Sequence, residues 1–280
     1  MRKVWINGEW FDEGEAKVSV FDRGLLFSQS VYEVVPVIGG RLCNIGYHLA
    51  RLANSLKVAR ISDATDWAAV FTEAVEANRV DEGRVYLQVT GGNSGDRDFL
   101  SATPPPPPTR IVFTQTGAVI DHPLAARGLR IALKPEARWQ LRSAKTTQLL
   151  YSVLMKEEAR DAGLDDAWLV DGDHITEGTS SNAHIIDARG VLVSHPVDHG
   201  VLPGVTRICV MEIARGMGLT VEERPFTPEE LFAAREAFSS AASALILPVV
   251  EVDGRAIGNG AAGEITRAIR AAYVERLLNA

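Results

Sequence analysis

The chain has 280 residues, of which 46% are hydrophobic, enough to bury a large core and to form two compact domains. Its formal net charge of -7 argues against nucleic acid or a membrane surface as a partner, because both attract a surplus of lysine and arginine. The cysteines, Cys43 and Cys209, lie in no metal-ligand spacing, and no apolar run is long enough to span a bilayer, so we expect a cytoplasmic protein without a structural metal.

The first part of the chain alternates strand and helix patterns. Apolar and polar residues alternate on either side of the turn signals at 7–8 and 39–40, which predicts two hairpins. Apolar residues recur at helical spacing in 49–56 and in 67–74, so two helices should follow. Residues 84–90 then return to the strand pattern.

A long segment without periodicity, GGNSGDRDFLSATPPPPPT, separates this strand from the next one, RIVFTQ. Its five consecutive prolines, Pro104 to Pro108, favour an extended polyproline conformation and predict a projecting arm. Long ordered loops often carry function.

The composition then becomes rich in small and turn-forming residues, which suggests a domain boundary. We expect a small N-terminal α/β domain over 1–118, a linker over 119–125 and a larger C-terminal α/β domain over 126–280. The fold class is α+β or mixed α/β, since both parts mix strands with helices and no internal repeat is visible. In the second domain we predict helices near 146–162, 205–217 and 264–278.

Five short motifs carry the chemistry: VYEV with Tyr32, HLARL with Arg51, RWQLRSAKTTQLL with Lys145, ITEGTSSN with Glu177 and LPGVTR with Thr206. In this order and spacing the chain resembles the fold-type IV pyridoxal-phosphate enzymes, which include D-amino acid aminotransferases, branched-chain aminotransferases and aminodeoxychorismate lyases. Its length, VYEV and the RW-to-lysine segment are most similar to D-amino acid aminotransferases. The resemblance implies a two-lobed fold and pyridoxal 5′-phosphate as the cofactor.

Lys145 is the first candidate for catalysis. A primary amine can form an imine with an aldehyde once it is neutral. Alone, a lysine here would be typical of a solvated surface. The resemblance makes it the Schiff-base lysine, whose freed amine would act as general base and then as general acid.

Glu177 lies in a turn-rich stretch and, taken alone, could be a simple cap. In the family the matching carboxylate faces the pyridine nitrogen and strengthens the ring as an electron acceptor. Ser180, Ser181 and Asn182 are then expected to hydrogen-bond behind it.

The cofactor phosphate requires hydrogen-bond donors and positive charge. Val205 and Thr206 open a predicted helix, whose backbone N–H groups and dipole favour an anion. By resemblance Arg51 adds a cation. D-amino acid aminotransferases commonly carry hydroxyl side chains in a second phosphate-contacting segment, whereas this chain has Ala241 and Ala242, which leave only backbone donors there unless Ser243 substitutes.

Substrate recognition departs from the family pattern. Tyr32 matches a tyrosine that helps to bind the substrate carboxylate. D-amino acid aminotransferases add an arginine and, two residues later, a histidine, but here only Arg97 can stand for the arginine and Phe99 replaces the histidine. Asp96 and Asp98 flank Arg97 and could orient or neutralise it. In the family this loop reaches the neighbouring subunit, so we expect a homodimer.

Other chemistries find little support in the sequence. The histidines, His199 among them, show no metal-ligand spacing and are interpreted as structural or solvated, and no dinucleotide or P-loop motif is present. The leading hypothesis is transamination between a D-amino acid, such as D-alanine, and 2-oxoglutarate or pyruvate. A branched-chain or (R)-amine aminotransferase, an aminodeoxychorismate lyase and, more remotely, a non-catalytic dimeric binding protein remain alternatives.

Overall fold

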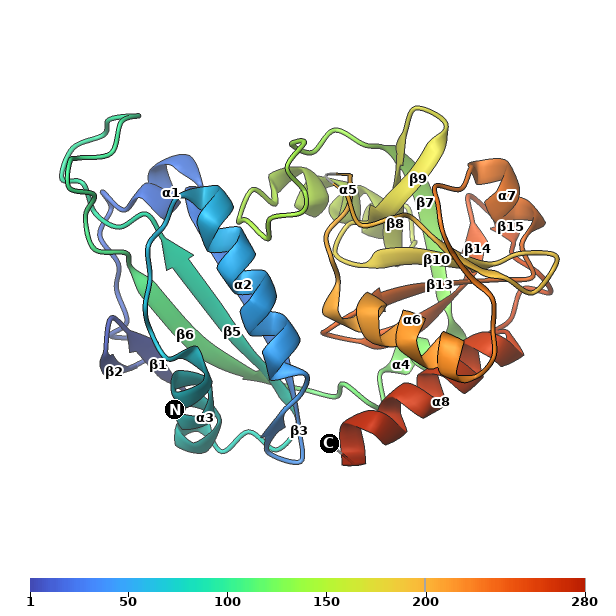
Figure 1. Ribbon diagram of the computed structural model, residues 1–280, viewed down its shortest axis with the longest axis horizontal. Helices are drawn as coiled ribbons and strands as arrows, with labels where there is room; N and C mark the ends of the chain where they lie inside the picture. The colour runs from blue at the N-terminus through green and yellow to red at the C-terminus, as the bar shows by residue number, and fades with distance from the viewer. Residues whose placement is uncertain (199, 280) are drawn as a thin grey trace. The chain divides into compact units, whose positions relative to one another are not determined.

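The computed structural model describes residues 1–198 and 200–279, so His199 and its expected structural or solvated role lie outside this description. The chain forms two compact units (Figure 1). The first unit comprises Met1–Val119 and Ala144–Gln148, and the second comprises Ile120–Ser143 and Leu149–Ala280. In the described part of the chain no helix is both long and apolar enough to cross a membrane.

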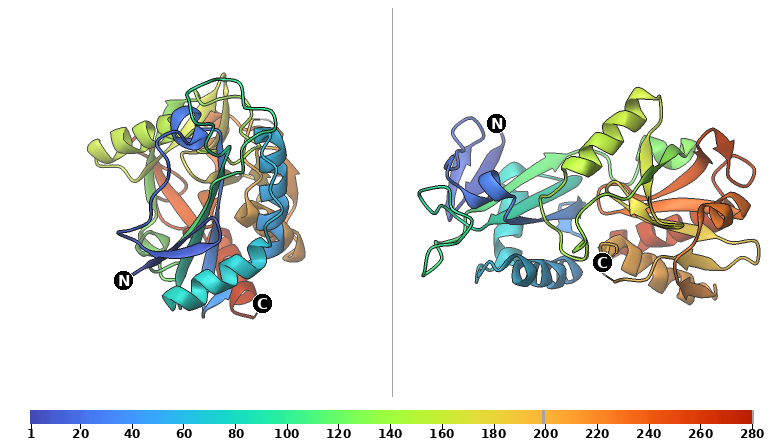
Figure 2. Two further views of the ribbon diagram at one scale, coloured as in Figure 1. Left: turned by 90° about the vertical axis from the view of Figure 1, so that its left-hand side faces the viewer. Right: turned by 90° about the horizontal axis from the view of Figure 1, so that it is seen from above.

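The first unit is built on an antiparallel sheet in the order β2-β1-β6-β5-β3-β4. Helices α2 and α3 pack on one of its faces, where Leu52 and Phe71 join a buried core with Val35, Val85 and Leu87 (Figures 1 and 2). The strands are β1 (Lys3–Ile6), β2 (Glu9–Asp12), β3 (Ser30–Ile38), β4 (Arg41–Leu42), β5 (Gly83–Thr90) and β6 (Arg110–Thr116), and the helices are α1 (Arg23–Phe27), α2 (Ile45–Ala59) and α3 (Trp67–Asn78).

Local sequence accounts for these elements. β5 alternates buried and partly buried residues, as expected for a strand with one face on the core. Asn7 and Gly8 adopt positive φ angles of 52° and 102°, which makes the predicted tight turn between β1 and β2. The proline-containing loop between β5 and β6 extends away from the sheet, as expected (Figure 1).

The second unit contains a mixed sheet in the order β12-β11-β10-β13-β14-β7-β8-β9, with β15 paired to β14. Because β9 also pairs with β10, the strands from β10 to β9 close into a barrel-like sheet. The strands are β7 (Leu129–Pro135), β8 (Asp166–Asp171), β9 (His174–Gly178), β10 (Asn182–Ile186), β11 (Leu192–Ser194), β12 (Val221–Glu223), β13 (Glu236–Ala241), β14 (Leu245–Val252) and β15 (Arg255–Ala256).

Helices of the second unit pack on this sheet. α6 and α8 lie side by side and contact β13, whereas α5 packs against β7 and β8 (Figures 1 and 2). The mixed α/β fold class is therefore confirmed. The helices are α4 (Pro123–Arg127), α5 (Leu150–Asp161), α6 (Val205–Gly216), α7 (Pro228–Ala233) and α8 (Glu264–Asn279).

The segment that carries Lys145 differs from the expectation. We predicted a helix from about 146 within the 126–280 domain, but α5 begins at Leu150, and Ala144–Gln148 packs with the first unit. The backbone of Tyr32 donates to the Lys145 carbonyl oxygen at 3.0 Å, and the Thr147 N–H donates to the Ser30 carbonyl oxygen at 3.1 Å. β4 pairs only with the far end of β3, so this segment satisfies backbone groups that β4 leaves unpaired.

Candidate active site

The amine of Lys145 lies over an aromatic ring. Its Nζ atom is 4.2 Å from the centroid of the Tyr32 ring. Tyr32 stacks on Tyr86 at 5.8 Å, and Tyr86 stacks on Phe113 at 4.6 Å, so the amine stands at one end of a row of rings that crosses three strands. Burial raises the pKa of Tyr86, which therefore remains a neutral phenol and donates to Gln88 Oε1 at 3.0 Å.

Arg51 is held by a buried carboxylate on the neighbouring strand. Its Nε and Nη2 atoms donate to Glu33 at 2.8 and 2.7 Å, and His48 Nδ1 lies 2.8 Å from Glu33 Oε2. Burial raises the pKa of Glu33, but Arg51 and His48 outweigh it and lower that pKa to about 2. Burial lowers the pKa of His48, so the imidazole is neutral at pH 7 and Glu33 carries the negative charge.

Arg97 is stacked rather than ion-paired. Its guanidinium carbon lies 5.2 Å from the centroid of the Phe27 ring and 5.2 Å from that of Phe99. Within residues 1–198 and 200–279, neither Asp96 nor Asp98 forms an ion pair with it. Asp98 Oδ1 instead accepts from the Leu100 N–H at 2.9 Å, so the guanidinium charge is not neutralised by a direct ion pair with its neighbours.

Glu177, on β9, is a buried carboxylate with three donors. Arg138 Nη1 donates to Oε1 at 2.8 Å, and Oε2 accepts from Asn182 Nδ2 at 2.9 Å and from the Leu202 N–H at 3.1 Å. Burial nevertheless raises the pKa of Glu177, against the lowering effect of Arg138. The expected hydrogen bond from Asn182 is present, whereas Ser180 is exposed.

Arg138 lies between two carboxylates. Besides Glu177, it donates from Nε to Glu136 Oε1 at 2.9 Å and from Nη2 to Glu136 Oε2 at 2.5 Å. Burial raises the pKa of Glu136, but the hydrogen bonds from Arg138 and its charge outweigh burial and lower that pKa, so this carboxylate is ionised. The two hydrogen bonds to Glu136 fix the plane of the guanidinium, and the remaining Nη1 atom donates to Glu177.

The first turn of α6 begins at Val205, and both Val205 and Thr206 are buried. Gly204 is the N-cap and has no side chain, so no N-cap side chain occupies the backbone N–H groups of this helix start. A Cβ atom on Gly204 would lie 1.9 Å from Asn182 Oδ1, which restricts this position to glycine.

Ala241 ends β13, and Ala242 follows in the turn that leads to β14. The hydroxyl groups just before them are already used inside the unit. Ser239 Oγ accepts from Trp168 Nε1 at 3.0 Å, and Ser240 Oγ lies 2.9 Å from His184 Nε2. An anion at this turn would therefore depend on backbone N–H groups or on the hydroxyl of Ser243, which lies in the same turn.

Comparison with known proteins decides the family. The family model described as amino-transferase class IV matches residues 30–252. The chain belongs to the class IV aminotransferases. This class IV aminotransferase is 32% identical over 282 residues to the D-alanine aminotransferase of Bacillus licheniformis, covering 99% of this chain and 98% of that relative. It is also 32% identical to the D-alanine aminotransferase of Staphylococcus aureus strain N315, with coverage of 98% and 97%.

Solved structures of branched-chain aminotransferases share the fold. The Escherichia coli enzyme superposes with a TM-score of 0.88 at 25% identity, covering 98% of this chain and 94% of that one. The enzyme of Thermoproteus uzoniensis, solved with norvaline, gives 0.88 at 30% identity, with coverage of 99% and 95%. A third branched-chain aminotransferase, solved with pyridoxamine 5′-phosphate, gives 0.89 at 27% identity, with coverage of 99% and 94%. The expected fold type and aminotransferase activity are thus confirmed.

Sequence reasoning missed the partners that hold two of the candidate residues. Arg51 donates to Glu33, which is also hydrogen-bonded to His48. Arg138 donates both to Glu177 and to Glu136. The sequence contains these partners next to the predicted residues. In VYEV the glutamate follows Tyr32 and so lies on the opposite face of the strand. In EARW a glutamate and an arginine stand two residues apart.

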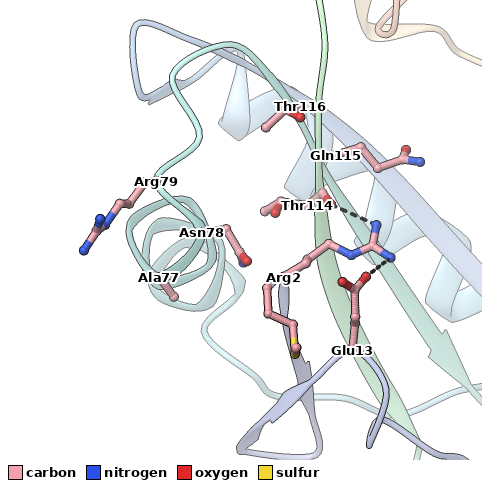
Figure 3. A pocket seen from close by; sticks show the side chains of 9 residues that line it. Arg2, Glu13, Ala77, Asn78, Arg79, Thr114, Gln115 and Thr116 are labelled. Carbon is pink, nitrogen blue, oxygen red and sulfur yellow. Dashed lines mark hydrogen bonds and ion pairs between the residues drawn. The ribbon is translucent and has the colours of Figure 1, made fainter.

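A pocket on the first unit is separate from these residues. It is a polar hollow of about 730 Å³ (Figure 3). Arg2 lines it and pairs with Glu13, another lining residue, at 3.0 Å. None of the candidate site residues of this class IV aminotransferase lines it, so we assign it no part in transamination. Its lining residues are Met1, Arg2, Glu13, Ala77, Asn78, Arg79, Thr114, Gln115 and Thr116.

Proposed function

We propose that this class IV aminotransferase moves an amino group between a D-amino acid, such as D-alanine, and 2-oxoglutarate or pyruvate. The proposal is carried by relatives about one-third identical over nearly the whole chain that are D-alanine aminotransferases. The stacked guanidinium of Arg97, which no neighbouring carboxylate neutralises, supports it, because the substrates on both sides of this reaction carry a carboxylate.

The cofactor is pyridoxal 5′-phosphate. When bound, it supplies an aldehyde carbon that takes up the amino group and a ring that accepts electrons. The donor set of this chain fits it: a half-buried primary amine, a buried carboxylate and a helix start without a side-chain cap. Lys145 would hold the aldehyde carbon, Glu177 the ring nitrogen, and Arg51, Val205, Thr206 and the backbone of Ala241 and Ala242 the phosphate.

Proton transfer falls to Lys145. Its Nζ atom removes the α-proton of the amino donor as a general base and later returns a proton as a general acid. Glu177 would face the ring nitrogen, and Arg138, which donates to its carboxylate, favours the charged form against the rise in pKa that burial causes. Tyr32 and Arg97 would bind the substrate carboxylate, the first through its phenol and the second through its guanidinium.

A homodimer is part of the proposal. Large apolar side chains are exposed before and within α1 and on the loop after β5. Phe21 is 47% exposed, Leu25 65%, Phe99 75% and Leu100 79%. Such a group of exposed apolar side chains favours burial against a second copy.

A branched-chain aminotransferase is the second candidate, because the solved structures named above belong to that class. Initial rates with D-alanine, L-leucine and (R)-1-phenylethylamine, each with 2-oxoglutarate, distinguish the candidates. We expect D-alanine to be the fastest donor. Faster turnover of L-leucine or of the arylalkylamine would overturn the proposal, and pyruvate released from aminodeoxychorismate without an acceptor would indicate a lyase.

A further inference from the structure

Arg23 connects α1 to a loop 75 residues further along the chain. Its side chain is buried, and each of its three side-chain nitrogen atoms donates a hydrogen bond. Nε donates to Gln29 Oε1 at 2.5 Å, Nη1 to the Asp98 carbonyl oxygen at 2.8 Å and Nη2 to the Phe99 carbonyl oxygen at 3.0 Å. One rigid guanidinium thus fixes two consecutive peptide groups of the loop.

The base of the same loop is attached to the same helix. The Arg23 N–H donates to the Gly92 carbonyl oxygen at 2.9 Å, and Asp22 Oδ2 accepts from Thr90 Oγ1 at 2.9 Å. Gly92, with a φ of 77°, lies against the returning strand of the loop, where a Cβ atom would be 2.0 Å from the Pro107 carbonyl oxygen. The loop is therefore held at its base and near its tip by adjacent residues.

The stack around Phe27 joins this attachment to Arg97. The Phe27 ring carries the Arg23 guanidinium at 4.9 Å and the Arg97 guanidinium at 5.2 Å, and its centroid is 5.2 Å from that of Phe99. The carbonyl groups that Arg23 holds belong to Asp98 and Phe99, the two residues that follow Arg97. Fixing these peptide groups fixes Phe99, and with it one wall of the stack that orients Arg97.

We propose that Arg23 is a positioning residue for substrate selection: it holds the loop so that Arg97 is presented, stacked and uncompensated, to the substrate carboxylate. The proposal rests on the carboxylate-binding function proposed above for Arg97. Lysine cannot replace Arg23 fully, because one ammonium group cannot reach a side-chain amide and two carbonyl oxygens in the same plane.

Two measurements on the holoenzyme test this, with the variants R23Q, R23K, R97Q and R23Q/R97Q. R189Q is the matched control, because Arg189 is an exposed arginine on the second unit. Hydrogen–deuterium exchange of the amides at 97–101 should be about tenfold faster in R23Q, less so in R23K and unchanged in R189Q. This readout does not depend on turnover.

Steady-state kinetics with D-alanine provide the second measurement. R23Q should raise KM about tenfold with kcat changed by less than about twofold, and R97Q should do the same. The double variant should have a KM no higher than that of R97Q, because both changes remove one interaction. Unchanged exchange in R23Q, or KM effects that multiply in the double variant, would overturn the positioning function. If R97Q keeps the original KM while R23Q exchanges faster, the carboxylate-binding proposal fails and the selectivity assigned to Arg23 fails with it.

Discussion

Asn182 and Glu177 are joined by a 2.9 Å hydrogen bond between their side chains at the point where their backbones pair and close the barrel-like sheet. The same amide of Asn182 also donates to the Leu202 carbonyl oxygen at 2.9 Å. Asn182 therefore connects three features: the closure of the sheet, the buried carboxylate of Glu177 and the segment that leads into α6.

Replacing Gly204 with alanine should weaken cofactor binding, because the new methyl group would overlap Asn182 Oδ1 and displace both the amide and the start of α6. We expect an affinity for pyridoxal 5′-phosphate about tenfold lower and a loss of stability of about 1–3 kcal/mol. Absorption titration and thermal unfolding measure the two effects. Gly216→Ala is the control, since that glycine ends the same helix and has no atom within 4 Å of the added carbon. Equal behaviour of the two variants would contradict this explanation.

Arg138→Gln should move the acidic limb of the pH profile upward. Burial already raises the pKa of Glu177, and Arg138 is the cation that opposes this effect, so its removal makes the carboxylate harder to ionise. We expect kcat/KM at pH 7 to fall about a hundredfold and to recover in part at higher pH. The exposed Arg160→Gln is the control. An acidic limb that stays in place would exclude this function of Arg138.

Glu33→Gln should change how stability depends on pH. The folded pKa of about 2 lies below the ordinary 4.5, so the unfolded chain binds the proton first. The contribution of Glu33 is complete above pH 4.5 and is lost as the pH falls towards 2. It is worth roughly 3 kcal/mol, and breaking a buried pair costs a similar amount. Urea unfolding from pH 7 to 3 should give Glu33→Gln a lower free energy of unfolding at pH 7, and this free energy should change less as the pH falls. The exposed Glu13→Gln is the control. An acid dependence as steep as that of the original protein would argue against Glu33 as its source.

Lys145→Ala should abolish turnover, by about a thousandfold or more, while the protein remains folded. Mass spectrometry after borohydride reduction should find the cofactor attached to Lys145 in the original protein and to no lysine in the variant. Lys17→Ala, which removes an exposed lysine of the first unit, should keep both activity and attachment. Attachment to a different lysine would refute the assignment.

The sequence predicted those features that depend on near neighbours. The alternation in 84–90 and the turn at Asn7 and Gly8 follow from local preferences, and the structure contains both. The pairing of the Lys145 segment could not be read in this way, because it depends on the unpaired end of β3 more than a hundred residues earlier.

For the candidate site, motifs predicted the hydrogen bond between Asn182 and Glu177. The guanidinium of Arg138 was missed because its direction is set by two carboxylates, and Glu177 lies 39 residues away. The spacing of apolar residues does not predict where a side chain in an irregular segment points. Such networks of charged side chains can therefore be identified only from the tertiary structure.

Because Ala144–Gln148 belongs to the first unit although the chain on both sides belongs to the second, neither unit is one continuous piece of polypeptide. A fragment that stops at Val119 leaves part of β3 without its neighbour, so the first unit cannot be complete on the ribosome until residue 148 has emerged. The strip that carries Lys145 is thus among the last parts of that unit to be made, and gene fragments cut at the apparent boundary should yield an incomplete product.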